Sequence, residues 1–410
     1  MGLLTKLNQV KIWAPLTFKV HAPLHFDFYV KASSPISRGV ELFEIESWIS
    51  GHKMNQIEQF KSSVITGIFE YISTINPEAP YLIDRLRIAY QLSSILRDKS
   101  SLLHDFSQSF PSNPTNFPIY WKDPENTSCV PLRQMIADEF FLYRNSYDKI
   151  FDLDKQVLSN ITFEEFICLD SITKNKAVVV GKNLQLVPIV DCFPHSFEEN
   201  TEIIREGNVV RVYSKKDLEE GTVLTRNYGQ GNNYWFLMNH GFIPAVNPYH
   251  RLPFSPENLP EWKDITQKLG LTNRTVLEKF ENHEQYSMSG LKRELLKKFT
   301  AGGLGDCAFS QQTPDTELEK VFRIFFLNES DMSELQIKSY TDLFSLNFSS
   351  PISFRNQKNT EIILFKLSEM TQELLNFGFE GKHPLGQEIE SLDKSVVSKH
   401  FSYYSSRMNN

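Results

Sequence analysis

Blocks of strand-type and helix-type sequence alternate along this chain, and their order constrains the fold more than any other feature. Residues 26–46 have the pattern of two short strands around a turn. The apolar spacing then turns helical to about 160, and residues 177–250 return to short β-type runs. From about 257 the chain is helical again. Alternating strand–helix–strand units are not visible, so we expect an α+β fold rather than a doubly wound sheet.

The length suits two domains. A chain of 410 residues is long for a single hydrophobic core and comfortable for two. We expect a β-rich core over residues 1–250, interrupted by a helical insert at about 47–160. An all-helical domain is expected over residues 257–410.

The composition excludes several classes of protein. Hydrophobic residues make up 40% and charged residues 23%, as in ordinary soluble globular proteins. The net charge of −7 provides no basic footprint for nucleic acid, and no apolar run is long enough for a membrane span. The four cysteines form no C-x-x-C pair, which argues against a disulfide framework. We expect an intracellular protein of a reducing compartment, either the cytoplasm or the mitochondrion.

The chain also offers no metal site that fits a known spacing. Cys168, Cys192, His240 and His250 could be imagined as ligands, but their spacing matches no zinc pattern. We therefore expect no metal.

The first 26 residues contain lysines and no acidic residue. This pattern superficially resembles a mitochondrial presequence, but the segment lacks arginine and is poor in serine. The alternative is a first helix of the fold with Trp13 packed inward. We favour the helix, and the sequence leaves mitochondrial targeting open.

Several local signals predict turns and helix ends. Thr162 precedes "FEEFICLDSI" and is expected to cap that helix, and Asp191 is expected to cap a turn. The proline-rich stretch at 110–131 is expected to be an irregular surface connection. "GQGNN" at 229–233 could be a phosphate-binding loop, but we expect no helix after it and find no lysine. Asn233 is expected instead to brace this segment.

Five stretches occur in an order that resembles one family more specifically than any of them does alone. They are "VKASSPISRGVELFEI", with Gly39 in its turn, "SLLHDFSQSFPSNPTNFPIYW", "LVPIVDCFPHS", "NYGQGNNYWFLMNHGFIPAVNP" and "FRNQKNTEIILFKL". Together they resemble the SET-domain proteins of the Rubisco large-subunit methyltransferase class. In that class a β-rich SET core is split by a helical insert and followed by a helical substrate-binding domain. The resemblance covers most of the chain.

This resemblance implies methyl transfer from S-adenosylmethionine to a protein side chain, usually lysine. The amine must be neutral to attack, so such a site desolvates the ammonium and lets its proton leave. Tyr228 stands at the position of the family's catalytic tyrosine, which orients the amine. His195 stands where the family's histidine contacts adenine through its backbone, although a ring stacked among its neighbours is the simpler role.

The implied cofactor site departs from the family pattern. The glycine-containing loop that lets backbone amides approach the cofactor aligns with Asp27 and Tyr29. The cofactor-binding asparagine is replaced by Pro194, which has neither a side-chain amide nor a backbone N–H. The channel tyrosine is replaced by His240.

A further departure is the basic residue expected after the Thr162 helix, which is at best Lys174 or Lys176. Neither offers the bidentate fork of arginine.

Two hypotheses of different classes follow. Under the first, the protein is a SET-fold scaffold with a degenerate cofactor site that binds a protein partner or serves as a structural subunit of a larger assembly. Under the second, it is an active, divergent S-adenosylmethionine-dependent lysine methyltransferase using Tyr228 on a protein substrate. We favour the scaffold, because several changes coincide around one predicted pocket.

Overall fold

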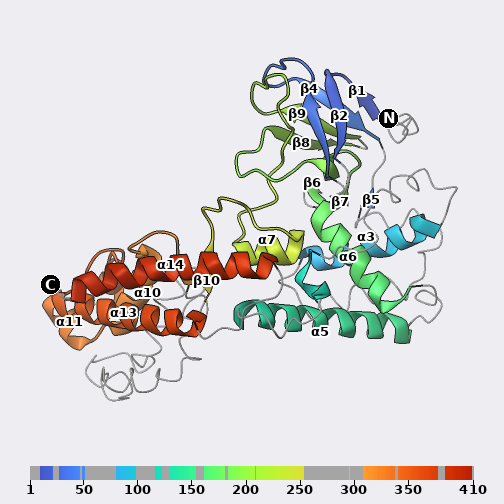
Figure 1. Ribbon diagram of the computed structural model, residues 1–410. Coiled ribbons are helices and arrows are strands. Elements are labelled where there is room, and N and C mark those ends of the chain that lie inside the picture. Colours follow the sequence, from blue (N-terminus) through green and yellow to red (C-terminus); the bar gives the residue numbers. More distant parts are fainter. Residues whose placement is uncertain are drawn as a thin grey trace. The chain divides into compact units, whose positions relative to one another are not determined.

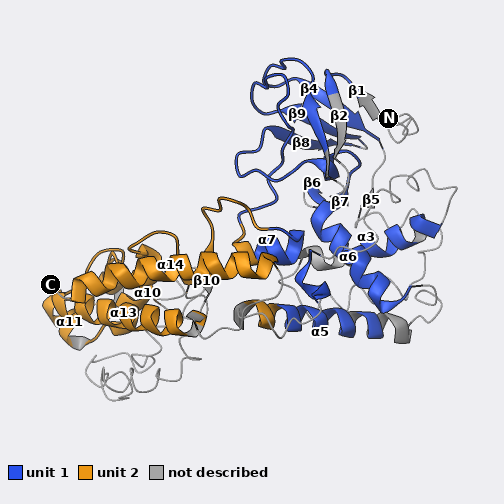
Figure 2. Cartoon of the chain, viewed as in Figure 1, with its two compact units in different colours: residues 1–122, 136–230, 235–242 blue, residues 123–135, 231–234, 243–410 orange. Residues whose placement is uncertain are grey.

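The computed structural model divides the chain into two compact units. Unit 1 comprises Met1–Lys122, Ile136–Gln230 and Trp235–Phe242, and unit 2 comprises Asp123–Met135, Gly231–Tyr234 and Ile243–Asn410 (Figure 1, Figure 2). Sheets and helices occur together, so the predicted α+β fold class is confirmed. The structure describes residues 10–21, 27–46, 49–50, 80–97, 116–121, 130–153, 161–180, 183–207, 209–253, 295, 308–337, 340–376 and 384–408.

A four-stranded antiparallel sheet lies in unit 1. Its strands, in spatial order, are β1 (Val10–Ile12), β4 (Glu41–Ile45), β9 (Val209–Ser214) and β8 (Thr201–Glu206). Every second residue of β9 is buried, as expected for a strand with one face on the core. The β4–β9 pair joins the chain before the helical insert to the chain after it.

Two smaller sheets accompany this one. β2 (Leu16–His21) and β3 (Asp27–Ala32) form an antiparallel hairpin. β5 (Ile49–Ser50), β7 (Asn183–Leu186) and β6 (Val178–Val180) form a three-stranded sheet in the order β5-β7-β6. Within the β-type runs expected over 177–250, the run at 184–191 is strand only at its start, because β7 ends at Leu186.

The core of unit 1 is aromatic and β-branched. Phe43 of β4 and Phe193 are completely buried and meet edge to face, with ring centroids 6.1 Å apart. Val210, Val212 and Leu224 belong to the same buried cluster. This packing fixes the segment around Phe193 against the sheet.

The expected first helix is wrong. Residues 10–12 and 16–21 form strands, and Trp13 between them is 61% exposed rather than packed inward. Backbone bonds from Trp13 and Ala14 to the Leu42 carbonyl hold this corner against β4. Cross-strand pairing with β4 and β3 decides the local structure of this segment.

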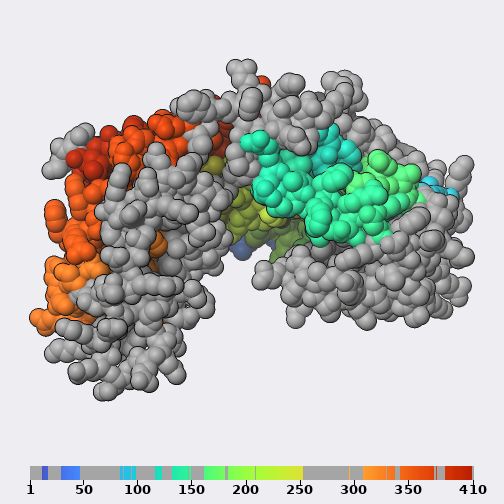
Figure 3. Space-filling view, turned by 90° about the horizontal axis from the view of Figure 1, so that it is seen from below, coloured from blue at the N-terminus to red at the C-terminus, as the bar shows by residue number. Residues whose placement is uncertain are grey.

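Three helices lie between β5 and β6 in the sequence. They are α3 (Pro80–Arg97), which packs beside the three-stranded sheet, α5 (Val130–Leu153), of which Ile136–Leu153 lies in unit 1, and α6 (Phe163–Lys176). Ile88 and Leu92 of α3 join Leu169 and Ile172 of α6 in a second buried cluster. Figure 3 shows α5 on the surface of unit 1 in that view.

Thr162 caps α6 as predicted. Its hydroxyl accepts a hydrogen bond from the Glu165 backbone N–H at 3.1 Å. We expect Thr162→Ala to cost about 1 kcal/mol of unfolding free energy, because one N-terminal amide loses its acceptor. Thr162→Ser keeps the acceptor and serves as the control in urea unfolding monitored by far-ultraviolet circular dichroism. Equal losses in both variants would contradict a capping role.

The expectation of a surface connection at 110–131 is wrong for the part that the structure describes. Phe117, Pro118 and Trp121 are buried around the 3-10 helix η3 (Pro118–Tyr120). Gly241 lies so close that a Cβ there would approach the Phe117 ring at 3.2 Å. Gly241 also has φ +70, so two constraints favour glycine at this position.

Unit 2 is mainly helical, as expected, with one small sheet. β10 (Arg251–Pro253) pairs antiparallel with β11 (Ala308–Ser310), so an all-helical domain over 257–410 is wrong in this detail. The helices, given in chain order, are α10 (Thr316–Phe326), α11 (Glu329–Glu334), α12 (Tyr340–Phe344), α13 (Phe354–Asn376) and α14 (Pro384–Met408).

The two longest helices of unit 2, α13 and α14, pack antiparallel. Phe365 stacks on Phe401 at 5.4 Å, and one turn earlier in α13 Glu361 accepts a hydrogen bond from Arg407 at 2.6 Å. Within the described parts of the chain, no helix combines the length and apolarity needed to cross a membrane.

Candidate functional site

Two segments that are far apart in sequence meet around Tyr228 in unit 1. Pro194–Ser196 runs parallel to the segment containing Arg226: the Arg226 N–H donates to the Pro194 carbonyl at 3.1 Å, and the Ser196 N–H donates to the Arg226 carbonyl at 3.0 Å. On its other side, the Leu224 N–H donates to the Val30 carbonyl of β3 at 2.8 Å. The site therefore lies where the 193–196 turn, β3 and the 222–229 segment converge.

Tyr228 is held at both ends. Its hydroxyl donates to the Phe193 carbonyl at 2.8 Å, and its backbone N–H donates to His195 Nδ1 at 3.2 Å. The turn preceding Phe193 is strained, since Ile189 has φ 73, an unfavourable region for a β-branched residue. The predicted catalytic tyrosine is thus fixed in place by the predicted cofactor segment.

His195 is stacked within an aromatic cluster, which is the simpler of its two predicted roles. Its ring centroid lies 5.3 Å from that of Tyr228, and further rings surround the pair, namely Phe197, Phe236 and Phe242. Burial, helped by the positive charge of Arg226, lowers the pKa of His195 to about 4, so the ring is neutral at pH 7.

His240 lies next to Tyr228, as its alignment with the channel tyrosine predicts. Their ring centroids are 4.7 Å apart, and His240 is only 7% exposed at the end of α7 (Asn233–His240). Burial lowers the pKa of His240 well below its usual range. Asn175 of α6 donates to the His240 carbonyl at 2.7 Å and so holds the end of α7.

The sequence reasoning missed Arg226, which is central to this site. Its guanidinium lies 4.0 Å from the Tyr228 ring centroid and is buried. It donates to the backbone carbonyls of Asn175 (3.2 Å), Lys176 (3.4 Å) and Ala177 (3.2 Å), which close the C-terminus of α6. Its position two residues before Tyr228 in an extended segment was the available signal, since such residues share a face.

The glycine-containing loop predicted at Asp27 and Tyr29 is wrong. Both residues lie in β3, in regular register with β2. The Lys31 ammonium lies 4.9 Å from the Tyr29 ring centroid. The turn after β3 contains Gly39, with φ 82, as the sequence predicts. The cofactor role of Asp27 and Tyr29 stays a prediction.

The two lysines considered at the end of α6 differ in their surroundings. Lys174 is buried, forms an ion pair with Glu139 and lies 5.3 Å from the Tyr143 ring centroid. Burial raises the pKa of Asp191, and the positive charge of Lys176 partly offsets this rise. Asp191 itself is buried within the 3-10 helix η5 (Val190–Cys192), so it does more than cap an exposed turn.

The "GQGNN" segment differs from expectation in one respect. α7 starts directly after it, at Asn233, so the absence of a following helix was a wrong prediction. The predicted bracing is confirmed, because the Asn247 amide donates to Asn233 Oδ1 at 2.8 Å and to the Gly231 carbonyl at 3.0 Å. The four cysteine and histidine residues considered as metal ligands form no metal-type cluster in the described part of the chain.

The residues present do not fit S-adenosylmethionine well. Pro194 offers no N–H, and the carbonyls of Phe193 and Pro194 already accept from Tyr228 and Arg226. The sulfonium is a cation, and the buried Arg226 guanidinium would oppose it. No catalytic step through this cofactor follows from these side chains.

We expect the His195 site to make the fold sensitive to acid. The pKa of His195 is lower in the folded chain than in the unfolded one, so unfolding takes up a proton and stability falls as pH drops from about 6.5 to about 4. Arg226 and Glu199 act on this ring in opposite directions, and Arg226 has the larger effect. His195→Asn retains an acceptor for the Tyr228 N–H but does not titrate there.

The loss of stability in this range should therefore be smaller in His195→Asn than in the wild type, by about 1 kcal/mol after allowance for partial exposure. Urea unfolding at pH 7, 5.5 and 4 measures it. Parallel pH profiles for the two proteins would contradict this role of His195.

Comparison with known proteins agrees with this arrangement. Crystal structures of the SET domain of LSMT bound to lysine and AdoHcy, and of Rubisco LSMT bound to AdoMet, match with a TM-score of 0.63 and 16% identity, covering 99% of this chain and 90% of theirs. The ribosomal lysine N-methyltransferase set10 of Schizosaccharomyces pombe is 21% identical over 276 residues, or 63% of this chain. The chain matches only 46% of that relative, about half its length. No protein-family model matches. The chain thus has the fold of the SET-domain structures of Rubisco LSMT.

Proposed function

We propose that this protein descends from S-adenosylmethionine-dependent protein-lysine methyltransferases, has a degenerate cofactor site and acts by binding a protein, as a partner or a subunit of an assembly. The observation that carries this proposal is the buried Arg226 guanidinium, 4.0 Å from the Tyr228 ring centroid. A lysine methyltransferase has to admit two cationic groups beside its tyrosine, the sulfonium and the incoming ammonium. A permanent positive charge at this place opposes both.

The electrostatic repulsion between Arg226 and a cationic group beside Tyr228 is considerable. Two unit charges about 5 Å apart repel by about 3 kcal/mol at an effective dielectric constant near 20. No carboxylate among the described residues forms an ion pair with Arg226, whose donors meet backbone carbonyls instead. Pro194 and His240 further support the proposal, because each replaces a family residue that would contact cofactor or substrate. A protein partner follows from the relatives, which act on lysine side chains of proteins.

One observation favours the second candidate, an active protein-lysine methyltransferase. The Tyr228 hydroxyl is fixed by the Phe193 carbonyl at 2.8 Å, as an orienting group should be. Under this second hypothesis, backbone groups bind the cofactor, and Arg226 only holds the Tyr228 ring in place.

Titration calorimetry with S-adenosylmethionine separates the two candidates. We expect no saturable heat at a protein concentration of about 100 μM, which would place any dissociation constant well above the micromolar range. One-site binding at micromolar affinity would contradict the degenerate site. In that case transfer of a tritiated methyl group to proteins of a cell extract, compared between wild type and Tyr228→Phe, would test for the enzyme.

A further inference from the structure

The outer side of α5 exposes two large apolar side chains. Phe141 is 69% exposed and Phe140 beside it is 48% exposed, whereas Ile136 and Tyr143 on the inner side are buried. Exposed aromatic residues are enriched in protein interfaces, but single ones also occur on ordinary surfaces. The residues around Phe141 therefore have to show what covers it.

Polar contacts on the inner side fix the orientation of α5 about its own axis. The Tyr143 hydroxyl donates to Asp170 of α6, and the Tyr147 hydroxyl donates to the Ile161 carbonyl at 2.7 Å. Figure 3 shows the helix at the surface of unit 1. Phe141 is thus held outward on a rigid element, so a partner would not have to order this surface before binding.

The exposed face of α5 has a regular pattern around Phe141. Residues three and four positions away on a helix share a face, and the four such neighbours of Phe141 are all exposed. Asp138 and Arg144 lie three positions before and after it, and Ala137 and Asn145 lie four positions before and after it. An acid and a base therefore stand at equal distances on either side of one aromatic ring.

This pattern is complementary to itself. If two copies of α5 cross antiparallel at Phe141, position 138 of each copy lies opposite position 144 of the other. Two equivalent contacts between Asp138 and Arg144 then flank the contact between the two Phe141 rings, as a two-fold symmetric interface requires. A parallel crossing would instead place like charges opposite each other. The charges thus favour one partner and one orientation.

The existing contacts of these side chains leave room for this arrangement. Arg144 pairs with Asp148 of its own helix at 3.0 Å, and about half of each side chain is exposed. Asp138 also has a contact within its own chain. Surface ion pairs contribute little to stability, so sharing Arg144 with a second carboxylate costs little. Phe141 would supply most of the affinity and the charges would set the register.

We propose that a second copy of this chain binds the exposed face of α5, with the two helices antiparallel and crossing at Phe141. One helix face is small beside the about 1,200–2,000 Å² that stable interfaces bury, so we expect a dissociation constant of about 10–100 μM. This inference goes beyond the proposed function and does not depend on whether the cofactor site is degenerate.

Sedimentation velocity of the full-length protein tests the dimer. Between about 2 and 200 μM the wild type should shift from the monomer mass toward twice that mass. Phe141→Ala should raise the dissociation constant at least about tenfold. Phe354→Ala removes a phenylalanine that is 85% exposed at the start of α13, and as the matched control it should dimerise like the wild type.

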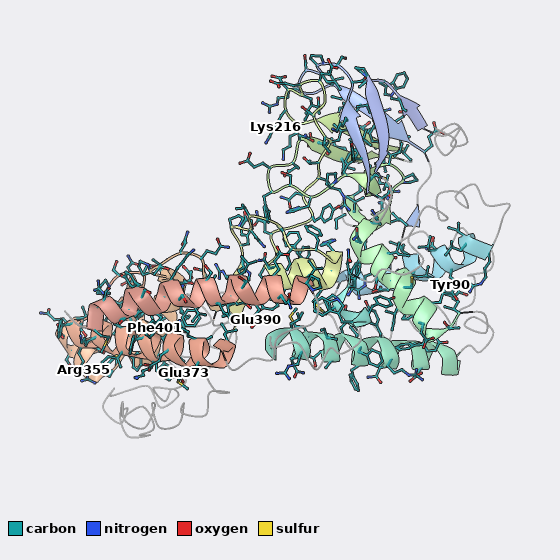
Figure 4. All side chains as sticks on the ribbon, in the orientation of Figure 1. Tyr90, Lys216, Arg355, Glu373, Glu390 and Phe401 are labelled. Atoms are coloured by element: carbon teal, nitrogen blue, oxygen red, sulfur yellow. The ribbon has the colours of Figure 1, made fainter. Side chains whose placement is uncertain are left out.

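Charge reversal tests the antiparallel register. Asp138→Arg and Arg144→Asp each place like charges at both flanking contacts, so each should weaken self-association about tenfold or more. Mixed together, the two variants restore opposite charges at both contacts and should associate with each other about as tightly as the wild type does. Arg355→Asp, at the exposed start of α13 (Figure 4), is the charge-reversal control and should dimerise normally.

Three results would overturn the inference, provided that circular dichroism shows each variant to be folded. A wild type that remains monomeric at about 200 μM excludes a second copy and assigns the face to a different protein. A dimer that Phe141→Ala leaves unchanged lies elsewhere on the molecule. Failure of the two charge-reversal variants to associate with each other contradicts the antiparallel crossing at Phe141.

Discussion

Asp170→Ala is expected to lower the free energy of unfolding of unit 1 by about 3 kcal/mol, because it leaves a largely buried guanidinium without its partner. Asp170 of α6 is fully buried; it accepts from Arg85 Nε of α3 at 2.7 Å and from the Tyr143 hydroxyl of α5. These bonds link three helices that lie near one another in Figure 1. Arg85 keeps 16% of its side chain exposed, so the cost should lie at the lower end of the range for buried pairs.

Amide hydrogen exchange followed by mass spectrometry measures this effect separately in each unit, so two-state unfolding of the whole chain need not be assumed. The slowest amides of α3 and α6 should exchange about 100-fold faster in Asp170→Ala, since about 1.4 kcal/mol corresponds to a factor of ten. The double variant Arg85→Met with Asp170→Leu removes both charges and should regain most of the loss. A double variant no more stable than Asp170→Ala would show that the hydrogen bonds, rather than the unpaired charge, dominate.

Asp393→Ala is expected to cost unit 2 about 2–5 kcal/mol, since two buried polar groups lose their common partner. Asp393 of α14 is fully buried, receives the Tyr234 hydroxyl and lies 3.1 Å from His250 Nε2. Both neighbours are themselves fully buried, so water does not replace the carboxylate. The exchange of α13 and α14 should accelerate while that of α3 and α6 remains unchanged.

Asp393→Asn is the matched control. The amide retains an acceptor for Tyr234 and a second polar atom for His250, and the pKa of Asp393 is already raised by burial, so loss of the negative charge should cost little. We expect less than about half of the effect of the alanine variant. Equal acceleration in both would mean that unit 2 requires the negative charge of Asp393 and not only a hydrogen-bond acceptor at this position.

The arrangement of the fold followed from periodicity, and its exceptions have physical causes. Helix-type spacing predicted that the chain after about 257 is helical, as α10 and α13 confirm, and Thr162 marked the start of α6 through its hydroxyl. The prediction for the segment around Trp13 failed because the short strands on either side of it are stabilised by cross-strand pairing, β1 with β4 and β2 with β3, which apolar spacing does not show.

The sequence predicted those residues of the site that stand at motif positions and have side chains suited to the implied reaction. Tyr228, His195 and His240 were identified from motif positions, and the structure brings them together. Arg226 was missed because its role depends on the end of α6, which it reaches across about 50 residues of sequence. Asp27 and Tyr29 were expected in a loop, but their pairing with β2 places them in a strand.

The pairing of β4 with β9 also imposes an order on folding during synthesis. Leu42, Phe43 and Ile45 are buried against a strand that begins at Val209, so the whole insert must emerge before these side chains find cover. At about 5–20 residues per second, the ribosome takes about 10–30 s to make the intervening chain. For that interval β4 has β1 on one edge only, and its other edge is open to pairing with any other nascent chain. This exposure during synthesis follows from the topology and not from the stability of the mature protein.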